Sequence, residues 1–253
     1  MTRPVLRRLL LAAIASPLAL GLAACGESGP DGAAAPSGDP IAEIAAPEGT
    51  TWADTVSKTQ EGGYLMGNPD APIKLVEYGA LSCSHCATFA EASSPELRET
   101  FVNSGRVSFE LRPFMLNAFD IAATLLTTCG ANEAVIPLSD QFWAWQPQMF
   151  ENLQGASQAQ MQQIDALPPQ QRFPALAQAA GMTEFFAARG ISADQASACL
   201  SDQSRVQALV DGSERASQDF DITGTPTFLI NGQKVEGNTW SAIKTRLEEM
   251  GAR

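Results

Sequence analysis

Histidine is almost absent from this sequence, and positively charged residues are scarce. The 253 residues include a single histidine, and 16 lysines and arginines against 28 aspartates and glutamates, which gives a formal net charge of −12. One histidine cannot build a zinc site that needs several, and it leaves no distant base for a cysteine nucleophile. An acidic chain has no electrostatic attraction for nucleic acid. We therefore expect no metal, no cofactor and no nucleic-acid partner.

Long apolar runs are also missing. The one apolar stretch, which ends at Ala24, follows three arginines and is short for a transmembrane helix, so residues 1–24 are typical of an export signal. It ends in Leu22-Ala23-Ala24-Cys25, which resembles the lipobox of bacterial lipoproteins, where the cysteine carries the lipid. We predict a lipid anchor at Cys25, with an ordinary signal peptide as the alternative. The mature chain is then expected on the periplasmic face of a bacterial membrane, inner or outer.

Residues 25–55 are predicted to form a flexible tether. They are rich in glycine, alanine, proline and serine, with only isolated apolar residues such as Ile41 and Ile44. Such a stretch buries too little surface to offset the entropy of ordering it. The roughly 200 residues that remain are enough for one globular unit with its own core.

The order of the remaining signals predicts an α/β fold with a long helical block. A strand is expected at 73–78, a helix from Cys83 with a second helix start at Ser94-Pro95, and a strand at 107–111. No strand signal occurs from 117 to 220, where alanine, glutamine and leucine dominate. The pattern closes with a strand at 227–230, the turn Asn231-Gly232, a return strand at 233–235 and a helix at 240–250 with Ile243, Leu247 and Met250 on its apolar face.

Cys83-Ser84-His85-Cys86 is the motif with the clearest chemistry. It lies where a strand gives way to a helix, whose first turn offers free N–H groups and a partial positive charge. Both favour the thiolate, the reactive form of cysteine, and His85 adds a second positive influence. We predict that Cys83 is an exposed, ionised nucleophile and that Cys86, one turn deeper, closes or resolves the disulfide.

Two further cysteines, Cys129 and Cys199, lie 70 positions apart. Once Cys25 and the C-x-x-C pair are set aside, they are an even number in a chain expected to be exported, a setting in which disulfides persist. We hypothesise a structural disulfide between them. Two buried free cysteines are the alternative.

A second motif, Gly224-Thr225-Pro226-Thr227-Phe228, precedes the last hairpin. A proline that enters a strand removes a backbone donor and needs a special reason. A cis Thr225–Pro226 bond supplies one, because it places the ring beside the cysteines and frees the backbone edge of Thr225 for an incoming peptide. An ordinary trans proline is the alternative.

Together these motifs resemble the thioredoxin superfamily, and more closely the DsbA-like thiol–disulfide oxidoreductases. The resemblance runs from about Tyr64 to Met250. It implies a thioredoxin-like fold whose helical insertion, 117–220, lies between the second and third core strands. The N-terminal part with the C-x-x-C is then 56–116, and the C-terminal part with the cis-proline is 221–253.

The resemblance also implies roles for single residues. Cys83 is the nucleophile, Cys86 the resolving cysteine and Pro226 the cis-proline, while Glu77 matches a buried acid that tunes the cysteines and relays protons. An exposed strand residue is the alternative for Glu77. The remaining cysteine pair resembles an extra disulfide of some members. This chain departs from the common motif at Ser84, where the family usually has proline.

The activity implied is formation of disulfides in unfolded or partly folded exported proteins. The resemblance further implies a membrane redox partner that recycles the protein, and we expect a monomer. A reductase or isomerase of the same fold is the first alternative. A lipoprotein that carries Cu(I) between Cys83 and Cys86 is the second, although such carriers usually add a distant histidine or methionine.

Overall fold

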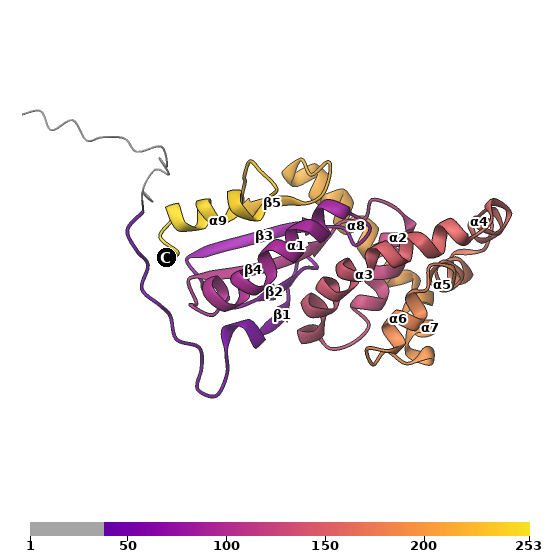
Figure 1. Cartoon of the computed structure of the whole chain (residues 1–253), viewed down its shortest axis with the longest axis horizontal. Helices are drawn as coiled ribbons and strands as arrows, with labels where there is room; N and C mark the ends of the chain where they lie inside the picture. Colours follow the sequence, from indigo (N-terminus) through magenta and orange to yellow (C-terminus); the bar gives the residue numbers. More distant parts are fainter. Residues whose placement is uncertain (1–37) are drawn as a thin grey trace, which may run out of the picture. The chain divides into compact units, whose positions relative to one another are not determined.

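A six-stranded mixed sheet forms the centre of residues 38–253, which are the residues that this computed structural model describes (Figure 1). The predicted signal segment, Cys25 and the first part of the predicted tether lie outside them. The strands follow the order β1 (Val56–Lys58), β2 (Tyr64–Met66), β4 (Val107–Pro113), β3 (Ile73–Gly79), β5 (Thr227–Ile230) and β6 (Gln233–Lys234). Only β3 and β4 pair in parallel.

The alternation of side chains along β3 divides the core between the two faces of the sheet. Leu75 belongs to the main core with α1 (Ser84–Glu96), the π-helix (Leu97–Val102) and α9 (Trp240–Glu249). Val76 and Tyr78 belong to a second cluster with α8 (Gln203–Phe220). Because successive strand residues point to opposite faces, Glu77 lies on the first face and Tyr78 on the second.

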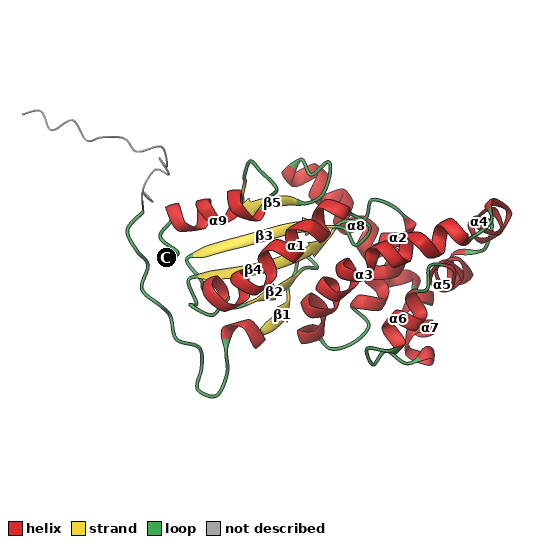
Figure 2. Cartoon of the chain, viewed as in Figure 1, coloured by secondary structure: helices red, strands yellow, loops and turns green. Residues whose placement is uncertain are grey.

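Between β4 and β5 the chain is helical, as the lack of strand signals predicted (Figure 2). A mixed sheet with a helical insertion between β4 and β5 is the α/β layout predicted from the sequence. The helices before α8 are α2 (Ala118–Thr127), α3 (Val135–Gly155), α4 (Gln158–Asp165), α5 (Pro169–Ala179), α6 (Met182–Ala187) and α7 (Ala193–Ser201). No helix in residues 38–253 is long and apolar enough to cross a membrane.

Within the predicted tether, residues 38–44 and the turn at Trp52 contact the rest of the fold, while most side chains of 42–51 are exposed. The Gly38 and Ile41 N–H groups donate to the carbonyls of Glu249 and Gly251, at 2.7 and 2.9 Å. A short 3₁₀ turn, Trp52–Asp54, then leads into β1, and the Trp52 side chain is buried. Ile41 is held by the C-terminal end of the chain, and the Ile44 N–H donates to the Ser104 carbonyl, so the partners of this segment lie far away in the sequence.

Three local expectations also differ from the structure. Strands β1 and β2 were not predicted, because each has only three residues. Ser94 does not begin a helix, since α1 continues through Pro95. Met250 is 38% exposed, whereas Ile243 and Leu247 are buried as predicted.

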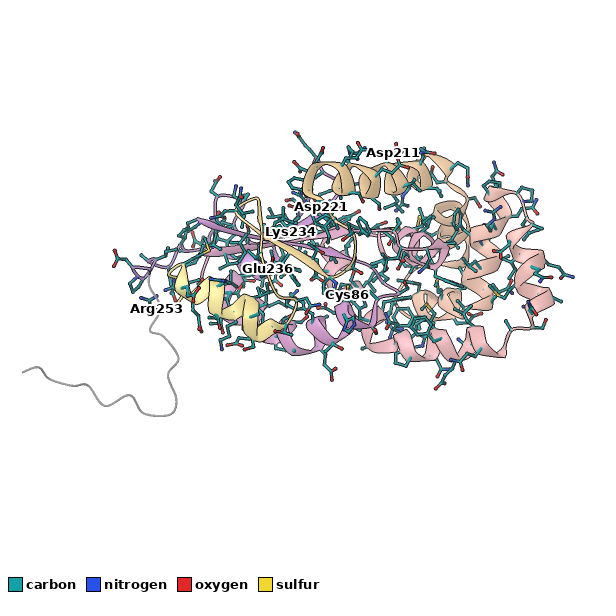
Figure 3. The ribbon with its side chains drawn as sticks, turned by 90° about the horizontal axis from the view of Figure 1, so that it is seen from above. Cys86, Asp211, Asp221, Lys234, Glu236 and Arg253 are labelled. Carbon is teal, nitrogen blue, oxygen red and sulfur yellow. A yellow bond between two sulfur atoms is a disulfide. The ribbon has the colours of Figure 1, made fainter. Side chains whose placement is uncertain are left out.

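The predicted C-terminal hairpin is present. Asn231 and Gly232 both have positive φ, at 50° and 79°, as a tight two-residue turn requires. The return strand β6 pairs with β5, and Lys234 forms an ion pair with Asp221 at 3.3 Å (Figure 3). Strand β5 also pairs with β3, with Thr227 opposite Tyr78, so Pro226 enters the sheet beside the central strand.

Candidate active site

Cys83 is the N-cap of α1, directly after the loop that leaves β3. Its sulfur accepts a hydrogen bond from the Cys86 N–H at 3.4 Å. Cys86 lies one turn into the helix and is fully buried. The pair thus has the placement expected from the sequence, with the first sulfur at the positive end of the helix.

The two sulfurs have opposite acidities. The hydrogen bond from the Cys86 side chain lowers the pKa of Cys83 to about 5, with smaller contributions in the same direction from the Thr225 side chain and the backbone of Cys86 and His85, against the effect of burial. Burial raises the pKa of Cys86, helped by its hydrogen bond to Cys83 and by the charge of Glu77. Near neutral pH, Cys83 is a thiolate and Cys86 a thiol.

The sequence predicted an exposed Cys83, and this was wrong in degree, because the residue is only 9% exposed. The cover comes from the loop before β5: the Cys83 sulfur lies 3.2 Å from the Thr225 carbonyl oxygen. His85 is exposed, and its backbone rather than its imidazole is among the causes that lower the Cys83 pKa.

The Thr225–Pro226 peptide bond is cis, as predicted. The Thr225 hydroxyl is buried and has no hydrogen-bond partner in residues 38–253. The Thr225 side chain is among the causes that lower the pKa of Cys83. A buried hydroxyl with an unused donor is well placed to stabilise a thiolate beside it.

Glu77 is 1% exposed, so it is the buried acid of the prediction and not an exposed strand residue. Its Oε1 atom has no hydrogen-bond partner within the described part of the chain. Burial raises its pKa well above the usual value, and the charges of Asp140 and Cys83 add to the effect. A methyl group at Gly79 would lie 3.2 Å from this oxygen, so glycine leaves room for the carboxyl group.

Three side chains of the helical block hold the loop that precedes Cys83. Trp143 donates to the Ala80 carbonyl at 3.0 Å and Gln146 donates to the Leu81 carbonyl at 2.7 Å, both from α3. Asp120, fully buried on α2, accepts from the Ser82 N–H at 2.7 Å. Three consecutive backbone units are thus fixed from outside the sheet.

Sequence reasoning missed these loop contacts. Asp120 carried the one usable signal, because Asn117 and Asp120 form a capping box at the start of α2. Asp140, a half-buried carboxyl on α3 beside Glu77, was also missed and has no local signature.

The Cys129–Cys199 disulfide is present, with a Cα–Cα distance of 6.0 Å. It joins the end of α2 to α7 within the helical block, and Arg205 donates to the Cys199 sulfur at 3.1 Å. The hypothesis of two free buried cysteines was therefore wrong. No group of three or more histidine, cysteine, aspartate or glutamate side chains suited to a metal occurs in residues 38–253.

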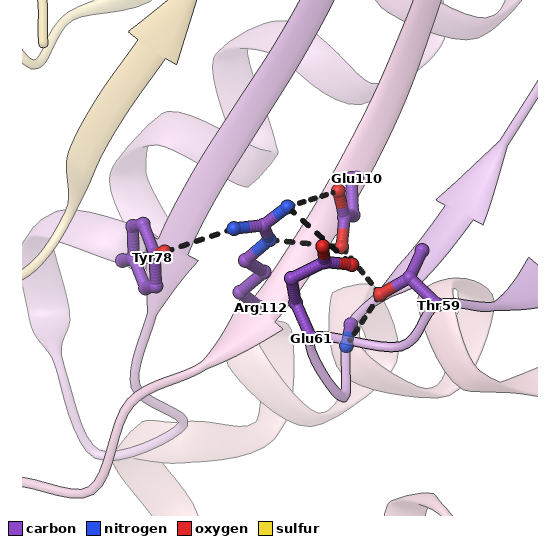
Figure 4. Close-up of polar contacts among 6 residues, drawn as sticks. Thr59, Glu61, Tyr78, Glu110 and Arg112 are labelled. Carbon is purple, nitrogen blue, oxygen red and sulfur yellow. Dashed lines mark hydrogen bonds and ion pairs between the residues drawn. The ribbon is translucent and has the colours of Figure 1, made fainter. Parts of the chain in front are cut away.

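The opposite face of the sheet carries a different polar cluster (Figure 4). Arg112 donates to both carboxylate oxygens of Glu110, at 2.8 and 2.9 Å, and to the Tyr78 hydroxyl at 3.0 Å. Glu61 lies 4.0 Å from the same guanidinium, and Thr59 donates to Glu110 at 2.7 Å. Every charge in this cluster has a partner, and the cluster ties the β1–β2 turn to the middle of the sheet.

Comparisons with known proteins agree with this architecture. The family model described as Thioredoxin matches residues 59–249. A protein-disulfide isomerase structure from Novosphingobium aromaticivorans is 28% identical, with a TM-score of 0.70, over 74% of this chain and 96% of that one. The structure of Wolbachia pipientis alpha-DsbA1 shares the fold at 20% identity and a TM-score of 0.58, over 74% and 89% of the two chains.

A curated relative from Rickettsia bellii, named for protein-disulfide oxidoreductase activity, is 23% identical over 192 residues. The match covers 76% of this chain and 66% of the relative. For a similar Rickettsia conorii relative the covered share is 61% of its length. The chain thus spans less than two thirds of the curated relatives that it matches first.

Proposed function

This chain belongs to the thioredoxin family, and on that premise we propose that it exchanges dithiols and disulfides in exported proteins through Cys83 and Cys86. The observation that carries the proposal is the opposite acidity of two sulfurs one helical turn apart. The outer sulfur can act as nucleophile or leaving group near neutral pH, and the inner one is held as a thiol.

The favoured direction is oxidation of the client. A client thiolate attacks the Cys83 sulfur of the Cys83–Cys86 disulfide, and the electron pair of the broken S–S bond goes to Cys86, which takes up a proton. A second client thiolate then attacks the client sulfur of the mixed disulfide and releases Cys83 as a thiolate. The client loses two electrons and two protons, one of which is taken up by Cys86 and the other by solvent. The protein ends with Cys86 as a thiol and Cys83 as a thiolate.

The stabilised Cys83 thiolate favours this direction, because it stabilises the reduced protein and makes the disulfide a stronger oxidant. We assign Thr225 and Pro226 to client binding, since their loop lies directly against the Cys83 sulfur. Glu77 is assigned as the proton donor to Cys86, the thiol whose pKa its charge raises.

The test is the equilibrium constant of the Cys83–Cys86 pair against glutathione. An oxidase should equilibrate at a potential well above that of cytosolic thioredoxins, near or above the roughly −180 mV of protein disulfide isomerase. A potential near the roughly −270 mV of thioredoxin would assign the chain to the reductase alternative instead. The Cys83→Ser variant is the control, and it should not equilibrate at all.

Export and lipid attachment through Cys25 are part of the same proposal, as is recycling by a membrane redox partner. The supporting observation is the Leu22-Ala23-Ala24-Cys25 sequence. Labelling of cells with a radioactive fatty acid should mark the wild-type chain and not Cys25→Ser. Equal labelling of both chains would reject the anchor.

A further inference from the structure

Glu77 needs a route for protons that its own position does not supply. When Cys86 leaves as a thiolate during client oxidation, its proton must come from a group in the interior. Glu77 is the nearest acid assigned to that step, but it is 1% exposed and its Oε1 atom is unpaired in the described residues. A buried carboxyl group that has given its proton to Cys86 must be protonated again before it can act a second time.

A small cavity connects Glu77 to a second carboxyl group. Its volume is about 10 Å³, close to the space that a single water needs, and its lining includes Glu77, Asp140, Ser94 and Arg98. The rest of the lining is mostly apolar, with the Trp143 ring among it. One water there would have polar partners on both sides, which is the condition for a bridging water.

Asp140 has the position of an exit from this cavity. It lies on α3 one turn before Trp143, so both side chains reach the sheet from the same helix face. Asp140 is half-buried, whereas Glu77 is closed off. Neither carboxyl group forms an ion pair with any residue from 38 to 253.

The groups that face Asp140 are few. Glu77 comes from β3, and Ser94 and Arg98 come from α1 and the π-helix that follows it. Arg98 is engaged elsewhere, donating to the Met66 sulfur and the Ala53 carbonyl. The strand β4 contributes Phe109 and Leu111 to the lining, while its Glu110 lies on the opposite face.

The acidities of the two carboxyl groups suit a transfer between them. Burial raises the pKa of Asp140 to about 6, moderated by Ser94 and Arg98. The pKa of Glu77 is raised well above its usual value, chiefly by its deeper burial. A group that titrates near neutral pH exchanges readily with solvent, and a group that holds its proton more tightly is the better store.

We propose that Asp140 passes protons between solvent and Glu77 through the shared cavity, so that the helical block supplies a proton-relay residue to the cysteine pair. This rests on the proposed exchange activity. As the Cys83–Cys86 bond breaks, Cys86 takes the electron pair and the Glu77 proton. The Glu77 carboxylate then takes a proton through the cavity water from Asp140, and Asp140 takes one from solvent. When the Cys83–Cys86 disulfide forms again, the proton of Cys86 leaves by the same path in the opposite direction.

The test is the pH profile of a single turnover. Oxidised full-length protein reacts with excess glutathione, is quenched with acid and is scored by thiol alkylation between about pH 5 and 8, the range that brackets the relay. The wild-type rate should show an inflection near the pKa of Asp140. Asp140→Asn should lose the inflection and slow roughly tenfold at neutral pH. Asp140→Glu and added formate should both restore the rate.

Asp211→Asn is the matched control, because this aspartate lies on α8, on the other face of the sheet, and should leave the profile unchanged (Figure 3). Should Asp140→Asn fold poorly, Asp140→Ser replaces it. An unchanged inflection in either variant would overturn the relay. So would a slower rate that Asp140→Glu and formate leave unrescued. Failure of the wild type to react with glutathione would instead reject the proposed function.

Discussion

The two faces of the central sheet treat buried charge in opposite ways. On the α8 face, Arg112 satisfies Glu110 and Tyr78, and no charge of that cluster lacks a partner. On the face under α1, Glu77 and Asp140 are buried to different degrees without an ion pair in the described residues, beneath a thiolate. Glu77 and Tyr78 are neighbours in one strand, but Glu77 faces the cysteine pair and Tyr78 faces the Arg112 cluster. The paired face stabilises the fold, and the unpaired face gives up stability for chemistry.

The largest expected effect on this contrast comes from Cys83. Its depressed pKa contributes stability to the reduced protein that is fully present above the unfolded pKa and lost as the pH falls through about 5. The unfolding free energy of the reduced wild type, relative to that of Cys83→Ser, should therefore rise between about pH 5 and 8.5, by up to about 5 kcal/mol. Urea unfolding of both proteins under reducing conditions measures the gain. A constant difference across that range would contradict it.

The next effect tests the paired face. Arg112→Leu leaves Glu110, which is 6% exposed, without a positive charge beside it and with only the Thr59 hydroxyl as a partner. It should cost about 3 to 5 kcal/mol of unfolding free energy. Glutathione exchange by the folded fraction should not change. Lys244→Met is the control, because it breaks a more exposed pair with Glu96 and should cost at most about 1 kcal/mol. Equal losses of unfolding free energy in the two variants would show that the buried Arg112–Glu110 pair contributes no more to stability than the exposed Lys244–Glu96 pair.

Glu77→Gln should act in the opposite direction from Arg112→Leu. Since burial raises the pKa of Glu77, its contribution to stability is present at low pH and lost as the pH rises through the folded pKa. The variant should match wild type near pH 4, the ordinary range of a glutamate, and be more stable than wild type at higher pH. Client oxidation should slow. Urea unfolding of both proteins at pH 4 and at a higher pH measures the difference. A variant that is less stable than wild type at both pH values would contradict the prediction.

Asp140→Asn should also become more stable than wild type as the pH rises, and its change in unfolding free energy should be the smallest of the four. Its pKa is raised to about 6, so the wild-type contribution declines from the ordinary aspartate range near pH 4 up to about 6. Because solvent reaches the half-buried group, the variant should gain only about 1 kcal/mol above that range. Thermal unfolding against pH measures the gain. A variant that loses stability at every pH would mean that the carboxylate is held by contacts and belongs with the paired face.

The parts of the fold predicted from sequence are those that local signals determine. The strand at 73–78 is marked by an apolar, partly β-branched run, and all of β3 except Lys74 is buried. The cis-proline and the Asn231-Gly232 turn depend on residues adjacent in the chain. The nucleophile and its helix start follow from the C-x-x-C itself. In each case the information lies within a few positions.

The parts that were missed depend on residues far apart in the chain. Asp140 becomes relevant only because α3 packs beside Glu77, and Gln146 only because its side chain reaches the Leu81 carbonyl 65 positions away. The short strand β2 exists because β4 offers a free edge to pair with. Gly38 and Ile41 are held by the backbone of the C-terminal end of the chain. No local pattern encodes these contacts.

The place where the chain enters the described fold has a mechanical consequence. Residues 38–44 run beside Gly251 and Ser104, and Arg106 fixes the Ile41 carbonyl at 2.6 Å next to the start of β3. Cys83 follows the other end of that strand. A protein held by its N-terminus would take up any pull at the end of the sheet remote from its sulfurs. The two cysteines follow the opposite end of β3, so a force applied through residues 38–44 would not act on them directly.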